Sequence, residues 1–454
     1  MRALVFSALG HVFPISLVEG SKAQVSTELK WRNFVSVSVE GKEPKEFKAK
    51  LPYAAEAEAL KAEGYEVRTV LLVPITFAVY MRDPPEDVNS LRRDVVSFVR
   101  TSVDSEFDEV RVVPVSGHFR LTVSGLPVVV SSHIGNARYE VFYTVRSESL
   151  GFKPDLIALD TTFAGGQLAA SLLEGLHYAV LDAAFLLGKE VKLYTFSAEM
   201  HDDHAALVRN LVGYTGRLTP KDVRLALEEV QSVGRVGGSP IEARGRSLFA
   251  ELRLALELCS PLYFAQRALD LREIGAYNPD QLEAYIWDNA RAEKRAEYSV
   301  SFGASLFKGA VTYSVWRDVV DAINKSLGEP PYSLNSLSRV LELMPKACSD
   351  AFVKEVGPAL SLVSQLESGR EEYTLGELKE ALRRPLAEVL EFVKSKELDR
   401  AIRKHKRECP EAEWGAFGLL DEAVTVTRGG KLMYSENCWK NVIKAFREAS
   451  GLAE

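Results

Sequence analysis

The sequence predicts an α/β domain with a mainly parallel, doubly wound sheet, followed by an all-α domain. In the first half, short apolar runs rich in β-branched residues alternate with longer segments whose apolar residues recur at helical spacing. This alternation is typical of βαβ units, which build parallel sheets. Beyond residue 247 such short runs become rare and helical periodicity dominates. We therefore expect a sheet domain over residues 1–212, a Gly-rich and helical linker over 213–246, and a helical domain over 247–454.

Each expected strand of the first half is a short run bounded by turn signals, and each expected helix carries an apolar stripe. The expected strands cover residues 4–6, 31–39 as part of a hairpin, 70–73, 109–113, a hairpin around 125–127, 155–160, and 189–196 as the last strand. The expected helices cover residues 54–63, 88–103, 140–147, 167–187 and 205–212. Strands joined through helices lie parallel, so most of this sheet should be parallel.

The character of the chain changes from Gly213. Thr219 and Pro220 have the N-cap and first-turn chemistry of a helix, and residues 232–246 are rich in Gly and Arg, which suits a linker. The helices expected beyond it cover residues 247–258, 280–297, 302–327, 334–365, 375–403 and 436–449, several of them broken by Pro or Gly.

Composition narrows the classes of function. The chain has 454 residues, 46% of them apolar, and a formal net charge of -7. A chain of this size buries sizeable cores, and its acidic balance argues against a protein that coats nucleic acid, so any RNA contact should be confined to a local patch. The N-terminal apolar run is too short for a signal peptide, and the most apolar run, 70–81, is far below the ~20 residues that a bilayer needs. We expect a cytoplasmic protein without membrane contact.

The cysteines predict neither a zinc site nor a redox motif, because none of the four stands in CxxC spacing. Cys409 and Cys438 can pair with each other, which would be unusual in a mesophile's cytosol but not in that of a hyperthermophile.

The loop after the expected strand 155–160 is the first candidate ligand site. In a parallel sheet, ligands bind where strands end and helices begin, because free backbone N–H groups and the helix dipole attract phosphate. This loop opens a helix and offers two hydroxyls and two glycines. Its candidate ligand-binding residues are Thr161, Thr162, Gly165, Gly166 and Gln167. The alternative is a plain strand-to-helix turn capped by one of the threonines.

Two further loops should lie at the same end of the sheet. Gly10, His11 and Phe13 follow the first strand, and Ser116 and Gly117 follow the strand 109–113. Neither loop contains a GxGxxG sequence, and no GxxxxGK[ST] sequence occurs anywhere, so a dinucleotide-dependent dehydrogenase and a P-loop enzyme are disfavoured. Each loop taken alone is more often a solvated turn.

The sequence His201-Asp202-Asp203-His204 has the residue types of a metal site. Its two histidines at i and i+3 would share one helix face, but no third ligand is evident from spacing. The two acids serve equally well as cap and dipole partner of the helix expected over 205–212. We expect no metal.

A basic cluster over 400–407 stands out in the acidic chain, and it contains Arg400 and His405. A guanidinium clamps a phosphate through two hydrogen bonds, and an imidazole that titrates near neutrality moves the protons that attack by a ribose 2′-hydroxyl requires, so the pair suggests metal-independent RNA cleavage. Residues five apart on a helix are separated by about 140°. The pair therefore serves one substrate only if the helix breaks or two chains meet, and the alternative is a solvated basic helix end.

Taken together, these patterns resemble the CRISPR-associated CARF-HEPN ribonucleases over essentially the whole chain. The resemblance rests on the sequence Asp160-Thr161-Thr162-Phe163 before a Gly-bearing loop, and on Arg400 and His405 in the helical half. It implies a Rossmann-like CARF domain that binds cyclic tetra- or hexa-adenylate as an allosteric activator, and a HEPN domain that cuts single-stranded RNA. It further implies a homodimer, with higher assembly open, and no catalytic cofactor.

The resemblance assigns catalytic roles to two residues only. Arg400 would hold the scissile phosphate and His405 would act as general base or acid, leaving a 2′,3′-cyclic phosphate and a 5′-hydroxyl. The sequence departs from the family pattern at Phe163, where the family has His, and at Ala401, where the family commonly has a polar residue.

Two alternatives remain. One is a nonenzymatic nucleotide sensor that binds nucleic acid or protein through its helical half. The other is a sensor domain that also degrades its own activator, through the hydroxyls of Thr161 and Thr162.

Overall fold

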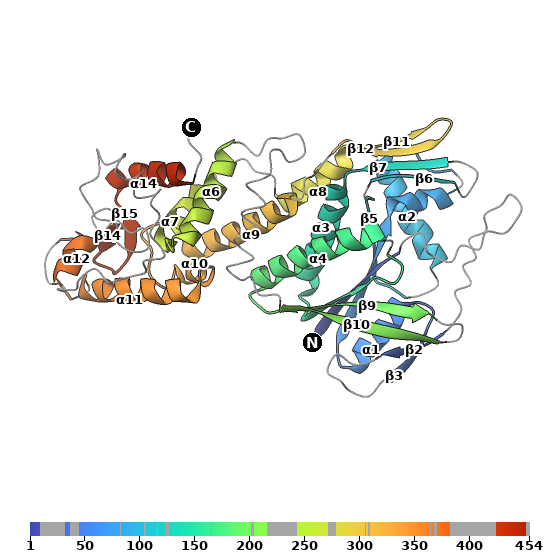
Figure 1. Ribbon diagram of the computed structural model, residues 1–454, viewed down its shortest axis with the longest axis horizontal. Helices are drawn as coiled ribbons and strands as arrows, with labels where there is room; N and C mark the ends of the chain where they lie inside the picture. Colours follow the sequence, from blue (N-terminus) through green and yellow to red (C-terminus); the bar gives the residue numbers. More distant parts are fainter. Residues whose placement is uncertain are drawn as a thin grey trace, which may run out of the picture. The chain divides into compact units, whose positions relative to one another are not determined.

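The computed structural model describes residues 1–9, 32–36, 45–81, 83–103, 106–115, 117–122, 127–164, 166–200, 204–215, 243–270, 278–304, 306, 309–363, 365–366, 370–381 and 424–450 (Figure 1). These residues form two compact units. Among them, the first unit contains residues 1–215 and 278–315, and the second contains 243–270 and 316–450. The division falls inside one helix, α9 (Gly309–Leu327).

The first unit is built on a sheet whose strand order, within the described residues, is β3-β2-β10-β9-β8-β1-β4-β5. Its strands are β1 (Arg2–Ala8), β2 (Arg32–Ser36), β3 (Lys45–Ala49), β4 (Glu66–Pro74), β5 (Glu109–Val113), β8 (Leu156–Asp160), β9 (Lys192–Met200) and β10 (His204–Thr215). The run from β9 to β5 is parallel, whereas β3 is antiparallel to β2 and β10 is antiparallel to β9. The predicted α/β character is confirmed, but the sheet is mixed, with a parallel centre.

Helices pack on this sheet as the apolar periodicity predicts. α1 (Pro52–Ala62), α2 (Val88–Ser102) and α3 (Ile134–Phe152) contact its strands, and α4 (Gly166–Leu187) packs against α3. α1 contacts β1, β3 and β4, and α3 contacts β1 and β5. Six consecutive residues of β1 and all five of β8 are buried, as expected for parallel strands that are covered on both faces.

The helix expected over 205–212 is wrong, because these residues form strand β10. Its side chains alternate between buried Ala205 and Leu207 and the more exposed Ala206 and Val208. It pairs with β9 along most of its length and with β2 over residues 204–207. This tertiary pairing overrides the helix propensity of the Ala-Ala-Leu sequence.

Helices α3 and α4 pack closely against each other at Gly175. A Cβ atom added to Gly175 would lie 2.7 Å from the backbone oxygen of Arg138, so no larger residue fits without a shift of the backbone. Ion pairs join the two helices on either side, between Arg138 and Glu174 and between Arg146 and Asp182.

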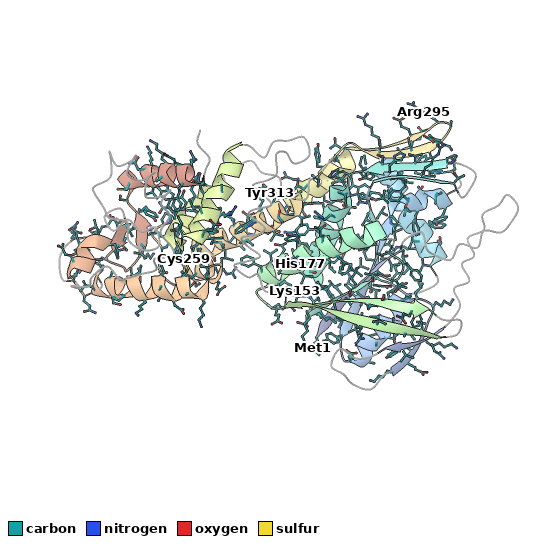
Figure 2. All side chains as sticks on the ribbon, in the orientation of Figure 1. Met1, Lys153, His177, Cys259, Arg295 and Tyr313 are labelled. Carbon is teal, nitrogen blue, oxygen red and sulfur yellow. A yellow bond between two sulfur atoms is a disulfide. The ribbon has the colours of Figure 1, made fainter. Side chains whose placement is uncertain are left out.

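A second sheet of the first unit has the order β11-β12-β7-β6 within the described residues. Its strands are β6 (Gly117–Thr122), β7 (Pro127–Ser132), β11 (Ala290–Lys294) and β12 (Tyr298–Phe302). The predicted hairpin around 125–127 is therefore confirmed. Arg295 lies between β11 and β12, at the tip of their hairpin, and its side chain is 81% exposed (Figure 2).

The helix expected over 280–297 is wrong beyond Asp288. Helix α8 (Pro279–Asp288) ends there, and the hairpin of β11 and β12 follows. Tyr298, Val300 and Phe302 are buried while the serines between them are more exposed. This period of two is the pattern of a strand that is buried on one face.

The second unit is mainly helical. Its described helices are α6 (Ala243–Glu257), α7 (Pro261–Ala268), the second part of α9, α10 (Ser338–Glu342), α11 (Lys346–Val363), α12 (Leu375–Ala381) and α14 (Glu436–Ala449). The prediction of an all-α domain is wrong in one respect, because β13 (Glu372–Thr374), β14 (Val424–Thr427) and β15 (Leu432–Tyr434) form a small antiparallel sheet. The single helix expected over 334–365 is divided into α10 and α11.

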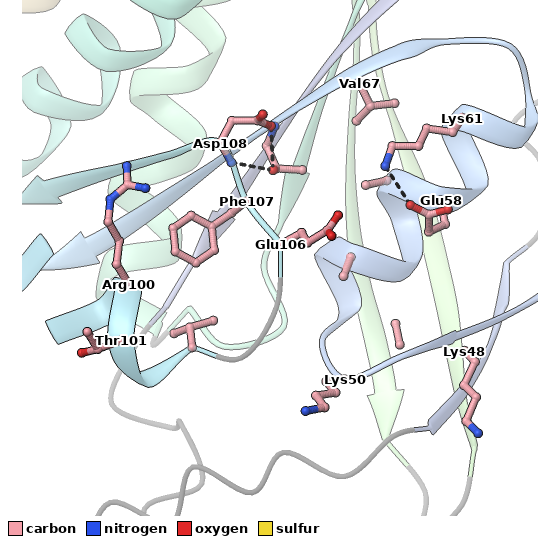
Figure 3. A pocket seen from close by; sticks show the side chains of 15 residues that line it. Lys48, Lys50, Glu58, Lys61, Val67, Arg100, Thr101, Glu106, Phe107 and Asp108 are labelled. Carbon is pink, nitrogen blue, oxygen red and sulfur yellow. Dashed lines mark hydrogen bonds and ion pairs between the residues drawn. The ribbon is translucent and has the colours of Figure 1, made fainter. Parts of the chain in front are cut away.

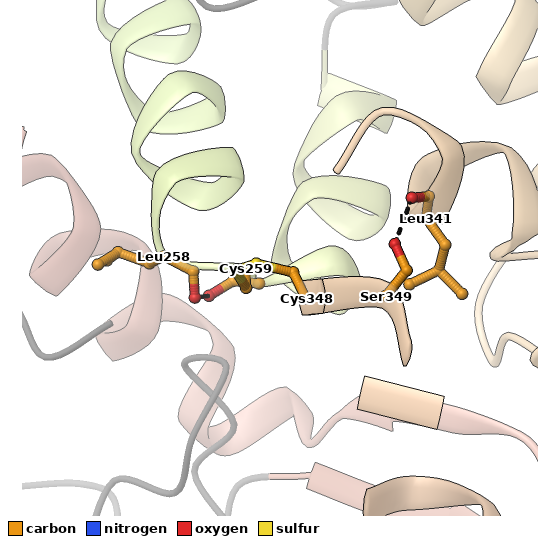
Figure 4. The surroundings of a disulfide bond; sticks show 6 residues. Leu258, Cys259, Leu341, Cys348 and Ser349 are labelled. Atoms are coloured by element: carbon orange, nitrogen blue, oxygen red, sulfur yellow. Dashed lines mark hydrogen bonds between the residues drawn. A yellow bond between two sulfur atoms is a disulfide. The ribbon is translucent and has the colours of Figure 1, made fainter. Parts of the chain in front are cut away.

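A disulfide joins Cys259, after α6, to Cys348 in α11 (Figure 4). The cysteine spacing did not predict this pair, because the two residues are 89 positions apart in the sequence. Cys438 is also disulfide-bonded, and Cys409, with which the sequence left a pairing open, lies outside the described residues.

None of the helices described above has the length and the apolar character that a membrane crossing requires.

Candidate functional site

The strand order of the parallel centre contains a point where the direction of winding reverses. After β1 the chain first forms β2 and β3 at the far edge of the sheet; β4 and β5 then follow on one side of β1, and β8 and β9 on its other side. β4 and β8, the two neighbours of β1, therefore lead to strands on opposite sides of it. In open parallel sheets, ligands commonly bind at the carboxyl ends of the strands where the strand order reverses in this way.

Ser7 and Asp160 join β1 and β8 at this point. They are register partners on adjacent strands, and the Ser7 hydroxyl donates a hydrogen bond of 2.8 Å to Oδ2 of Asp160. Both side chains are almost completely buried. A hydroxyl and a carboxyl are costly to bury without partners, so this bond specifies how the strand ends meet.

The other oxygen of Asp160 holds the loop that follows. Oδ1 accepts hydrogen bonds from the backbone N–H of Thr162 at 2.9 Å and from its hydroxyl at 2.6 Å. Burial raises the pKa of the Asp160 carboxyl above its ordinary value, while the hydrogen bonds from Thr162 and Ser7 oppose that rise. The carboxyl therefore fixes the conformation of the loop from beneath and is not itself exposed to a ligand.

The loop is also fixed to β9. The backbone N–H and the hydroxyl of Thr161 both donate to the carbonyl oxygen of Phe196, at 2.9 Å and 3.2 Å. The hydroxyl of Thr162 accepts from the backbone N–H of Ala198 at 2.9 Å. Both threonine hydroxyls thus use their hydrogen atoms within the protein, and they can offer a ligand only acceptor lone pairs.

The first turn of α4 begins directly after this loop, at Gly166 and Gln167. The leading N–H groups of a helix have no partners within it and carry the positive end of the dipole. A preorganised loop followed by a helix N-terminus is an arrangement that suits a phosphate-bearing ligand.

The structure brings only some of the sequence-predicted residues together. Thr161, Thr162, Gly166 and Gln167 form one segment at the reversal of the strand order. Gly117 lies elsewhere, because it opens β6 after β5, and β5 is separated from β8 by β1 and β4, a span of about 14 Å at the usual strand spacing.

The remaining predicted site residues lie outside the described part of the chain. They are Gly10, His11, Phe13, Ser116, Gly165, Arg400 and His405. His201, Asp202 and Asp203 of the candidate metal sequence also lie outside it, and His204 opens β10. Among the residues that are described, no group of three or more His, Cys, Asp or Glu side chains could hold a metal ion.

Sequence reasoning missed Ser7 as a part of this site. The signal was its place near the end of the first buried strand, since a polar residue inside a run as apolar as Leu4-Val5-Phe6 needs a buried partner. The partner could be identified only once β1 and β8 were known to be neighbours.

No protein-family model matches the chain, and no curated protein matches it.

Proposed function

We propose that the protein is a cyclic-oligoadenylate-activated endoribonuclease of type III CRISPR antiviral defence, acting in the cytoplasm as a homodimer. The observation that carries the proposal is the position of the Asp160-Thr161-Thr162 loop at the reversal of the strand order, between β1 and β8. This is the place in a doubly wound sheet where a phosphate-bearing ligand is expected.

The ligand-binding half of the proposal follows from the chemistry of the loop. A cyclic tetra- or hexa-adenylate presents several phosphodiester groups, and free N–H groups at the start of α4 suit one of them. The bonds from Asp160 and β9 keep the loop in one conformation before the ligand arrives, which lowers the entropy lost on binding. A two-fold symmetric ring matches two copies of this loop across a dimer axis.

The catalytic half is supported by the sequence alone. We propose that Arg400 holds and neutralises the scissile phosphate of a single-stranded RNA. His405 takes the proton from the attacking 2′-hydroxyl or returns one to the leaving 5′-oxygen. The bond from phosphorus to the 5′-oxygen breaks as the 2′-oxygen bonds to phosphorus, so the products are a 2′,3′-cyclic phosphate and a 5′-hydroxyl, without a metal or another cofactor.

Coupling of the two halves requires that the activator bind one conformation better than another. A ligand shifts an equilibrium only by its difference in affinity for the two states. The activator would therefore favour the arrangement of the two chains in which Arg400 and His405 meet one substrate.

The competing function is a nonenzymatic sensor, in which the same loop binds the nucleotide while the helical half binds nucleic acid or protein. This reading gains support from the placement of Arg400 and His405 five residues apart, which on a regular helix would separate their side chains by about 140°. The two functions make the same prediction for ligand binding and opposite predictions for RNA cleavage.

The variant His405→Ala tests the proposal, with Lys406→Ala in the same basic cluster as the matched control. Binding of labelled cyclic tetra- and hexa-adenylate should be unchanged in both variants. Activated cleavage of single-stranded RNA should be lost in His405→Ala and should persist in Lys406→Ala. Equal cleavage in the two variants would refute the catalytic role of His405, and absence of binding to the unmodified protein would refute the sensor role.

A further inference from the structure

Given the function proposed above, on which this inference rests, we propose that an adenine base of the activator lies on an uncovered part of the main sheet beside the Asp160 loop. Val208 is its apolar contact, and Glu199 selects adenine. The uncovered part is one face of the corner formed by β9, β10 and β2, which we term the β9–β10 face. Its residues are Thr195, Ser197 and Glu199 of β9, Ala206 and Val208 of β10, and Val35 of β2.

The strand register places these side chains on one side of the sheet. Those of β9 belong to alternate residues, which project to the same side of a strand. Glu199 is the register partner of Ala206, and Ser197 is that of Val208. Val35 is the partner of Ala206 on the other edge of β10. Because register partners on adjacent strands point to the same side, the side chains form one continuous surface.

Helix α1 covers only the opposite face of these strands. Tyr194 and Arg209, which project to that side, contact Glu56 of α1. On the β9–β10 face, by contrast, Val208 is 39% exposed, and the other side chains are half-buried or exposed. Its apolar residues adjoin one another across β10 and β2, so they form a small patch that another molecule can cover.

The β9–β10 face begins where the Asp160 loop is fastened. Asp160, the last residue of β8, is the register partner of Phe196, so β9 continues beyond the end of β8. The threonines of the loop bond to Phe196 and Ala198, the residues on either side of Ser197. Glu199 lies three residues beyond Phe196, about 10 Å along the strand, which keeps its charge away from a phosphate at the loop.

Helices α3 and α4 lie on the same side of the sheet as this face. Glu148 of α3 pairs with Arg68 of β4 at 3.1 Å. Arg68 is aligned through β1 and β8 with Leu193 of β9, which points to the same side as Thr195. α4 packs against α3. A phosphate at the N-terminus of α4 and a base on the β9–β10 face can therefore belong to one ligand.

The chemistry of the face suits an adenine base. Ser197 and Ala206 are small and leave a flat floor for a planar ring, and Val208 and Val35 supply apolar contact. The Glu199 carboxylate can accept a hydrogen bond from the exocyclic amine of adenine, whereas guanine has an oxygen acceptor at the same position, which a carboxylate repels. Within the described part of the chain, no side chain pairs with this carboxylate.

A pocket of about 1010 Å³ between α1, the end of β3, the start of β4 and the connection from α2 to β5 is a different place (Figure 3). It lies near the amino end of β4, whereas the Asp160 loop follows the carboxyl end of β8. Lys61 pairs there with Glu58 at 2.8 Å, and Arg100 with Glu109 at 3.8 Å. Its cationic side chains are thus engaged within the protein, and the pocket is not part of the activator site.

Calorimetric titration of the full-length protein tests the inference, with cyclic tetra- and hexa-adenylate, their inosine analogues and AMP as probes. Val208→Ala is the informative variant, because an exposed side chain can be shortened with little effect on the melting temperature, which is measured without ligand. Val353→Ala is the matched control, since Val353 is 42% exposed and lies in α11 of the second unit. Glu199→Gln tests selection, because inosine has an oxygen in place of the exocyclic amine and a glutamine amide can donate to it.

We expect Val208→Ala to weaken binding of the adenylate rings about fivefold, because it removes apolar contact area, and Val353→Ala to leave it unchanged. Glu199→Gln should lower the preference for adenylate over inosine rings at least about fivefold. Equal affinities of the two valine variants, or an unchanged preference in Glu199→Gln, would overturn the inference and leave the proposed function in place.

Absence of binding of both adenylate rings would refute the proposed function. Binding of AMP that is weakened by Val208→Ala would in that case still support the base site. Failure of AMP to bind as well would overturn the inference together with the proposed function.

Discussion

The buried carboxyl of Glu140 makes the stability of the first unit depend on pH. Glu140 lies in α3 and is 2% exposed. It accepts a hydrogen bond of 2.9 Å from Nε1 of Trp287 in α8, and the guanidinium of Arg92 in α2 lies 4.0 Å away. Arg92 also lies 3.8 Å above the ring of Trp287 and pairs with Glu283. The group therefore connects three helices.

The pKa of Glu140 is raised from 4.5 to about 8, chiefly by burial and then by the charge of Glu283, while Arg92, Trp287 and Arg111 oppose the rise. The folded protein thus keeps a proton that the unfolded chain releases above about pH 4.5. The stability associated with this proton is fully present below that pH and is lost as the pH rises through about 8. At about 1.4 kcal/mol per pH unit the loss reaches roughly 5 kcal/mol at most, of which about 2 kcal/mol develops between about pH 6 and pH 8.

The variant Glu140→Gln isolates this effect, because an amide oxygen still accepts from Trp287 but cannot ionise. The free energy of unfolding is measured by urea denaturation, followed by fluorescence and circular dichroism, for Glu140→Gln and for the unmodified protein. As the pH rises from about 6 to about 8, the unmodified protein should lose about 2 kcal/mol of stability relative to the variant. Glu342→Gln, at an exposed position of α10, is the control and should show no such growth. A difference that stays constant with pH would refute the reasoning.

Three further outcomes follow from other parts of the structure. Gly175→Ala should lower the melting temperature, because its Cβ would lie 2.7 Å from a backbone oxygen of α3. Gly151→Ala is the control and should leave the melting temperature unchanged or raise it, because nothing lies within 4 Å of the added Cβ. Equal effects of the two variants would contradict the close packing of α3 on α4. Replacing Cys259 and Cys348 together by Ala should destabilise the second unit by about 4 to 5 kcal/mol, since their disulfide closes a loop of 89 residues, and unchanged urea denaturation would contradict it. Thr162→Val removes the hydrogen bonds of the Thr162 hydroxyl to Asp160 and to Ala198, so it should weaken binding of cyclic oligoadenylates at least severalfold. Thr101→Val, which lies outside the Asp160 loop, is the control and should not weaken this binding.

The centre of the sheet and the candidate ligand loop could be predicted because their signals are local. β1 and β8 are continuous apolar runs, which is what burial on both faces requires, and each is followed by residues typical of a turn. The sequence around Thr161 could be placed between a strand and a helix without knowledge of the strand order.

The parts that were predicted wrongly depend on contacts between distant segments. β10 became a strand because β9 and β2 pair with it, although its sequence alone favours a helix. The hairpin of β11 and β12 lies beside β7, more than 150 positions earlier in the chain, and only the alternation of Tyr298, Val300 and Phe302 with serines indicated it. The disulfide of Cys259 depends on the same kind of long-range contact.

The most direct test of the proposed function is cleavage of a fluorescent single-stranded RNA by the purified protein in EDTA, with and without cyclic tetra- or hexa-adenylate. We predict that cutting appears only with one of the two rings, that it leaves a 2′,3′-cyclic phosphate, and that it is lost in Arg400→Ala. Tight binding of a ring without any cutting would contradict the nuclease and leave the sensor, and cutting that needs no ring would contradict activation through the Asp160 loop.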